Sequence, residues 1–223
     1  GGRPLPRAQG GLLHLPHRPF EWRDGRLWCP VSQAPMATEF ACARFAVPNM
    51  HSNGWVLFVD CDIVCLADIA DLFALADDRY AVMCVKHKQE SGVDIKMNDQ
   101  VQTYYARKNW SSVVLWNCSH PAHRVLTDKV LNTWPGRDLH AFKWLRDDEI
   151  GELSSEWNHL VGVSNPLSMA EPKILHFTLG GPWIPGWQGG PLDQLWRMER
   201  ENYREAVGRN PTHREAVGRN PTH

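Results

Sequence analysis

The sequence lacks three features that would mark common classes of protein. It has no excess of basic residues, because its formal net charge is −1 over 223 residues. It has no apolar run near the roughly 18–20 residues that a membrane-spanning helix requires. It has no Cys-x-x-Cys pair, and most of its six cysteines stand in apolar runs. We therefore expect no nucleic-acid partner, no transmembrane segment, and reduced core cysteines in a cytoplasmic protein.

What the sequence does contain is enough apolar residues for one core, 43% of the total, so one domain is the default. We expect this domain over residues 28–203. The preceding residues 1–27 are rich in Gly and Pro and read as a loop-rich remnant. Residues 204–223 contain the decapeptide "REAVGRNPTH" twice and form an expected tail without a catalytic role.

Apolar runs alternate with helical patterns between these ends. The strand candidates are "GWVLFVDCD", "RYAVMCVKH", "SSVVLWN" and "PKILHFT". The helix candidates are "APMATEFACARFAVPNM" closed by Pro48, "LADIADLFALADD", and "PAHRVLTDKVLNTW" with Pro121 in its first turn. Short continuous apolar runs are typical of strands buried on both faces. The alternation predicts an α/β sandwich around a mostly parallel sheet, with ligands beyond the carboxyl ends of the strands.

The run "WVLFVDCD" ends in two aspartates, Asp60 and Asp62, that a hydrophobic strand does not require. Residues two apart on a strand share a face, so both carboxylates could converge on one divalent ion. Hard carboxylates suit manganese (Mn2+) or magnesium (Mg2+), which also bridge phosphate oxygens. The structural alternative is that Asp62 caps the next helix and that Asp60 is only solvated.

Two functional interpretations compete for this pair. "VLFVDCDIVCL" fits the first motif of haloacid-dehalogenase-type phosphatases, in which the first Asp is a nucleophile and the second an acid and base. That scheme also needs a later lysine and a second acidic pair after a strand. Asp147 and Asp148 form an acidic pair, but no apolar strand precedes them.

The other interpretation uses more of the chain. "TEFACARF", "WVLFVDCDIVCLADIADLF", "NWSSVVLWN", "LSSEWNHLVG" and "KILHFTLGGPW" occur in the order found in glycogenin and the bacterial lipopolysaccharide galactosyltransferases. The chain resembles this family over about residues 28–196, and most of all a group of uncharacterised bacterial relatives. The resemblance implies a GT-A, Rossmann-like fold. It also implies sugar transfer from a nucleotide diphosphate, commonly UDP, with retention at the anomeric carbon.

The resemblance assigns roles to particular residues of this chain. The implied ligands of manganese are Asp60, Asp62 and His176. The implied contacts to the sugar donor are Arg44, Asn109, Trp110, Ser111, Ser112, Gly180, Gly181 and Trp183. The acidic element beneath the donor sugar falls on Asp147 and Asp148. Because glycines carry no Cβ, the amides of Gly180 and Gly181 could approach the β-phosphate closely, and Trp183 with Trp187 would suit a sugar-facing wall.

The sequence also departs from the family pattern. The usual first strand and its base-binding turn have no counterpart in residues 1–17, no lysine precedes Pro182 and Trp183, and Trp110 stands where the family has an Asn. We therefore expect a chain that lacks its first strand. A non-catalytic sugar-binding relative stays an alternative to a transferase with a glycan, lipid-linked sugar or protein as acceptor.

Overall fold

A four-stranded sheet forms the centre of the computed structural model, which describes residues 17–36, 38–87, 95–96, 100–101, 107, 109–164 and 171–209. Its strand order is β10 (Ile150–Glu152), β6 (Val82–Cys84), β9 (Val113–Asn117) and β4 (Trp55–Val59). β10 and β6 are parallel, whereas β9 is antiparallel to both β6 and β4. The expectation of a mostly parallel sheet is therefore wrong, because an apolar run indicates that a strand is buried but not which way it runs.

The core lies on both faces of this sheet because side chains alternate along β9, which is buried throughout. Trp116 packs on one face with Phe45 of η1 (Ala43–Ala46) and with side chains of α3 (Asp128–Thr133) and α4 (Gly136–His140). Leu115 packs on the other face with residues of α2 (Ile69–Phe73) and η4 (Ser155–Asn158). The mixed α/β architecture that the sequence predicted is confirmed in this coarse form.

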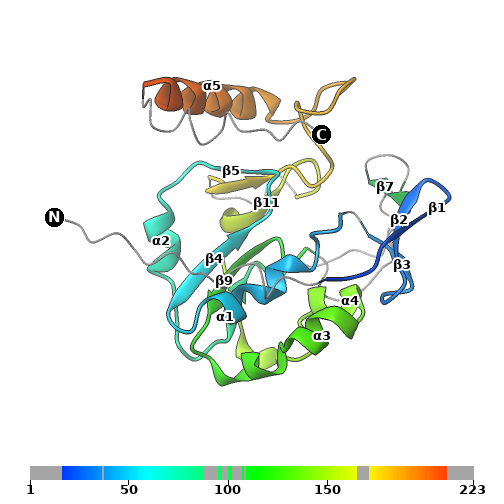
Figure 1. Ribbon diagram of the computed structural model, residues 1–223. Coiled ribbons are helices and arrows are strands. Elements are labelled where there is room, and N and C mark those ends of the chain that lie inside the picture. The colour runs from blue at the N-terminus through cyan, green and yellow to red at the C-terminus, as the bar shows by residue number, and fades with distance from the viewer. Residues whose placement is uncertain are drawn as a thin grey trace.

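A second, three-stranded sheet stands beside the first. Its order is β11 (His159–Leu160), β12 (Ile174–His176) and β5 (Ile63–Cys65). Helix α5 (Asp193–Arg209) lies across this sheet, on the side of the molecule away from α3 and α4 (Figure 1). Leu195 and Trp196 of α5 pack against the small core of this second sheet.

The remaining elements are short: β1 (Glu21–Arg23), β2 (Arg26–Cys29), β3 (Ala34–Pro35), α1 (Val47–Met50), β7 (Ile95–Lys96), β8 (Gln100–Val101), η2 (Pro121–Val125) and η3 (Asp147–Glu149). The expected loop-rich segment contains β1 and the start of β2, while its residues 1–16 lie outside the described ones. The duplicated tail begins inside α5, and residues 210–223 also lie outside the described part. Within the described residues, no helix is long and apolar enough to cross a membrane.

Two helix predictions need correction. The stretch from Ala34 to Met50 forms β3, turns, η1 and α1 instead of one helix. Pro48 lies in the first turn of α1, where its missing N–H costs nothing, and does not close a helix. The stretch that begins at Pro121 divides into η2 and α3, because the Thr127 hydroxyl accepts the Val130 N–H and starts a new helix.

Strand β4 is less buried than expected. Trp55 to Phe58 are half-buried and Val59 is exposed, because β4 stands at the edge of its sheet among the described residues. The strand assignment is correct, but the inference of burial on both faces is not.

Candidate metal centre

The two aspartates lie where the two sheets meet. β4 ends at Val59, and the Asp60 N–H donates to the Ser112 carbonyl at 2.9 Å, one step beyond the β4–β9 ladder. Cys61 and Asp62 form a turn, and β5 begins at Ile63. Asp60 and Asp62 are therefore joined by a turn between two sheets, and do not share a strand face as the sequence suggested.

The second sheet brings His176 to the same place. β5 pairs antiparallel with β12, so that Ile63 lies opposite His176 and the Phe177 N–H donates to the Asp62 carbonyl at 2.9 Å. One ligand atom each from Asp60, Asp62 and His176 lies within 4.8 Å of the others. His176 Nε2 is 3.5 Å from Asp62 Oδ1. The structure thus brings together the three residues that the sequence proposed as ligands.

The donor set of this group fits a divalent cation. Two carboxylates supply oxygen ligands, which magnesium and manganese prefer. An imidazole nitrogen is a poorer ligand for magnesium than for transition metals, so the mixed set favours manganese between the two. No ion is part of the structure, and the group is a candidate site on the chemistry of its residues.

Arg44 holds Asp60 in this group. Its Nη1 donates to Asp60 Oδ2 at 3.1 Å and its Nη2 lies 2.7 Å from Asp60 Oδ1, a bidentate ion pair. The same guanidinium donates to the carbonyls of Ser111 and Ala41 and lies over the Phe58 ring. Burial raises the pKa of Asp60, and Arg44 opposes that rise. Arg44 thus makes several contacts within the protein, and its contact with a donor stays a prediction.

Asn158 stands behind His176 and has no role in the sequence-based prediction. Its Oδ1 is 3.1 Å from His176 Nδ1, and its Nδ2 lies 3.2 Å from Ser112 Oγ and 3.4 Å from the Asn109 carbonyl. Asn158 is fully buried and His176 is 3% exposed. The only signal in the sequence was the stretch "EWN", which contributes to the family resemblance without indicating a function.

The turn from Asn109 to Ser112 lies at the same end of the sheet as Asp60. Ser111 Oγ is 2.7 Å from His140 Nδ1, Ser112 Oγ donates to the Asn109 carbonyl, and Trp110 Nε1 donates to the His87 carbonyl. These polar side chains, predicted to contact the donor, therefore bond within the protein. Their position near the metal group agrees with the prediction, and their contact to a donor stays a prediction.

His87 is a further residue near the group that sequence reasoning missed. It follows β6 at the sheet end where Asp60 follows β4. Burial, and after it the nearby His176 and His159, lower its pKa to about 4. A polar residue directly after a buried strand was the available signal.

Asp147 and Asp148 lie elsewhere. They precede β10. The Glu149 carbonyl accepts the Ala81 N–H, and the Ala81 carbonyl accepts the N–H of Asn117, which is paired with Trp55. Glu149 is therefore level with Trp55, which is five residues before Asp60 along β4, or roughly 16 Å at about 3.3 Å per residue. Asp147 pairs with Arg107, and Asp148 pairs with Arg146. The structure does not bring this acidic element to the metal group.

The glycines after β12 have structural reasons of their own. Gly180 has a φ of +110°, and its N–H donates to the Phe177 carbonyl. A Cβ on Gly181 would come within 2.3 Å of the Trp183 ring, which packs between Phe177 and Trp196. Trp183 thus joins α5 to the second sheet, and the N–H of Gly180 is already engaged.

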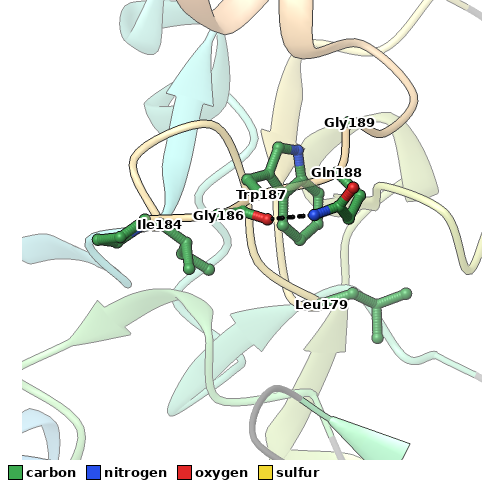
Figure 2. Close-up of a pocket in the computed structure, with 7 residues that line it drawn as sticks. Leu179, Ile184, Gly186, Trp187, Gln188 and Gly189 are labelled. Atoms are coloured by element: carbon green, nitrogen blue, oxygen red, sulfur yellow. Dashed lines mark hydrogen bonds between the residues drawn. The ribbon is translucent and has the colours of Figure 1, made fainter.

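A pocket of about 300 Å³ lies in the loop between β12 and α5 (Figure 2). Its polar groups bond within the protein, because Gln188 donates to the Gly186 carbonyl and Trp187 Nε1 donates to Asp193. Trp187 lines this pocket and Trp183 does not, and the sugar-facing role of either residue stays a prediction. The lining residues are Leu179, Ile184, Pro185, Gly186, Trp187, Gln188 and Gly189.

Over 187 residues the chain is 44% identical to "Protein CDI" of Arabidopsis thaliana. The matched region covers 82% of this chain and 72% of that protein. The chain therefore belongs to the family of this plant protein. No family model matches the chain. The bacterial group expected from the sequence is not supported by this relative.

Several solved structures of glycosyltransferases are similar to the chain at low identity. Streptococcus pneumoniae GlyE has a TM-score of 0.49 at 19% identity, and the match covers 70% of this chain but only 42% of GlyE. The galactosyltransferase LgtC, solved with donor and acceptor sugar analogues, has a TM-score of 0.42 at 15% identity, over 74% of this chain and 67% of LgtC. Mouse xyloside xylosyltransferase 1 has a TM-score of 0.39 at 11% identity, over 61% and 63%.

Proposed function

We propose that this protein is a metal-dependent glycosyltransferase that moves a sugar from a nucleotide diphosphate, UDP in the first instance, to a glycan, lipid-linked sugar or protein acceptor. The observation that carries the proposal is the convergence of Asp60, Asp62 and His176 where the two sheets meet. The order of motifs in the sequence supports the same assignment. Retention at the anomeric carbon stays a prediction from that resemblance.

Different residues of this chain would have different roles in the transfer reaction. Asp60, Asp62 and His176 would hold manganese, which would supply charge neutralisation for a diphosphate leaving group. Arg44 orients the Asp60 carboxylate through the bidentate pair. The turn from Asn109 to Ser112 forms the neighbouring wall.

A phosphatase of the haloacid-dehalogenase type has less support. Its second acidic pair would be Asp147 and Asp148, which pair with Arg107 and Arg146 and are not members of the group of Asp60, Asp62 and His176. His176 has no role in the phosphatase scheme, whereas it supplies the third ligand in the transferase scheme, so the geometry favours the transferase.

Replacing Asp62 by Asn tests the proposal. This change keeps the shape and removes one ligand charge, so we expect calorimetry with manganese and UDP to show a loss of affinity of about tenfold or more. His176→Ala should act in the same direction. Asp71→Asn is the matched control. It removes an equal charge at an exposed position of α2 and should leave the affinity unchanged.

Turnover separates the alternatives. With manganese and an acceptor mixture, the parent protein should release UDP from UDP-glucose or UDP-galactose, and Asp62→Asn should not. Equal binding of manganese and UDP by Asp62→Asn and the parent would contradict the transferase assignment. Hydrolysis of p-nitrophenyl phosphate through a phosphorylated Asp60 would favour the phosphatase, and sugar binding that ignores metal would favour a non-catalytic module.

A further inference from the structure

The hydrogen bonds around Asn158 determine which way its side-chain amide points. The Ser112 hydroxyl has one proton, which it donates to the Asn109 carbonyl at 2.8 Å. Ser112 Oγ can therefore only accept from Asn158, 3.2 Å away. The Asn109 carbonyl, 3.4 Å from the same amide, is also only an acceptor. Both neighbours thus require the NH₂ group of Asn158 on their side, and its oxygen must face His176.

This orientation decides the tautomer of His176. An amide oxygen only accepts, so His176 Nδ1, at 3.1 Å from it, must carry the proton. In the neutral imidazole the lone pair is then on Nε2. Nε2 lies 3.5 Å from Asp62 Oδ1, so two electron-pair donors face the space between them. Only the tautomer with the proton on Nδ1 presents a metal ligand there.

The competing tautomer would close the site. With its proton on Nε2, His176 would donate directly to the Asp62 carboxylate, and charge-assisted hydrogen bonds of this kind are strong. In that arrangement the unprotonated Nδ1 of His176 would face the Asn158 oxygen. Both atoms are hydrogen-bond acceptors on buried residues, and neither would have a donor. Asn158 therefore disfavours the tautomer of His176 that carries its proton on Nε2.

We propose that Asn158 is a positioning residue that selects the metal-binding tautomer of His176. The inference rests on the proposed metal site and extends it by a residue that contacts neither donor nor ion. Asn158 is the last residue of η4 and immediately precedes β11, which pairs in parallel with β12. Asn158 is therefore adjacent to a strand that pairs with the strand of His176, and the turn before β9 contacts its amide from the other side.

The test uses two independent measurements on the full chain. In the metal-free parent, ¹⁵N NMR of the imidazole well above the ordinary histidine pKa of about 6.5 should show the proton on Nδ1 of His176. Asn158→Ala should lose that preference, and titration with manganese alone should give an affinity about 10–100-fold lower, the range for partners of metal-bound histidines. Asn158→Asp, which still accepts from Nδ1, should recover most of the affinity.

Asn117→Ala is the matched control. It also truncates a buried Asn, whose amide donates to the Tyr80 carbonyl at 3.1 Å, but Asn117 is paired with Trp55 at the start of β4 and not with the end that carries Asp60, so manganese affinity should stay within about threefold of the parent. The inference is overturned if the parent carries the proton on Nε2, or if Asn158→Ala, folded by circular dichroism, binds manganese like Asn117→Ala. A parent that binds no manganese even with UDP overturns the proposed function itself, and the two failures are therefore distinguishable.

Discussion

Arg44 binds Asp60 in the folded protein. Its guanidinium also contacts two carbonyls and an aromatic ring, while the contact with the donor anion that the sequence suggested stays a prediction. Asp60 is partly buried, and its burial raises its pKa. Arg44 opposes that rise in pKa and so favours the ionised carboxylate.

At the residue scale, Arg44→Ala should lower the free energy of unfolding by about 2 kcal/mol, somewhat less than for a fully buried pair, because it leaves the Asp60 charge without its partner. Arg44→Lys should recover only part, since a point charge cannot reproduce the bidentate contact. Urea unfolding measures both. Arg79→Ala breaks an exposed pair with Asp77 and should change stability by less than about 1 kcal/mol. A loss in Arg44→Ala no larger than in this control would contradict the argument.

At the scale of elements, the attachment of α5 depends on one close approach. The Trp183 ring covers Gly181 and packs edge-on against Phe177 and at a tilt against Trp196. Because Trp196 belongs to α5 and Phe177 follows β12, this stack joins the helix to the sheet that carries His176 (Figure 1). Any side chain at position 181 must displace the ring.

Gly181→Ala should therefore cost about 1–3 kcal/mol of stability by overpacking, and hydrogen exchange of α5 amides should become faster. Gly208→Ala, within α5 itself, is the control. A Cβ there meets nothing within 4 Å, so alanine should be neutral or stabilise by up to about 1 kcal/mol. Unchanged α5 exchange in Gly181→Ala would show that Trp183 does not hold the helix.

At the scale of the whole molecule, buried histidines make stability depend on pH. Burial lowers the pKa of His123 to about 4, and its Nε2 contacts the Ala81 carbonyl at 3.0 Å beneath the central sheet. Burial lowers the pKa of His87 to about 4 and that of His140 well below its ordinary value. Folding therefore favours neutral imidazoles, whereas the unfolded chain takes up protons below about pH 6.5.

The sign of the effect follows from linkage. The contribution of His123 is fully present above about pH 6.5 and is lost as pH falls towards 4, since the unfolded state binds the extra proton. Between pH 7 and 5 this one residue should account for about 2 kcal/mol of lost stability. His123→Phe should be less stable at pH 7 but should lose about 2 kcal/mol less than the parent on acidification. Parallel pH profiles from urea unfolding of the two proteins would refute this.

The secondary structure was predicted correctly from the sequence for some segments and wrongly for others. The strands β4, β6, β9 and β12 were predicted because each is a continuous apolar run. The stretch around Phe40 and Val47 was predicted as one helix because its apolar spacing is helical, yet it forms turns and two short helices. Spacing describes a preference, and contacts elsewhere in the chain can override a preference of this size.

The sequence by itself determined which residue types are available for a site: Asp60 and Asp62 after one apolar run, and His176 at the end of another. It also determined the apolar strands that bury the core. Only the tertiary structure decided that β9 runs antiparallel, that Arg44 binds Asp60, that Asn158 lies against His176, and that Asp147 pairs with Arg107. The physical reason is that residue type and spacing act locally, whereas strand direction and hydrogen-bond partners are chosen between segments far apart in the chain.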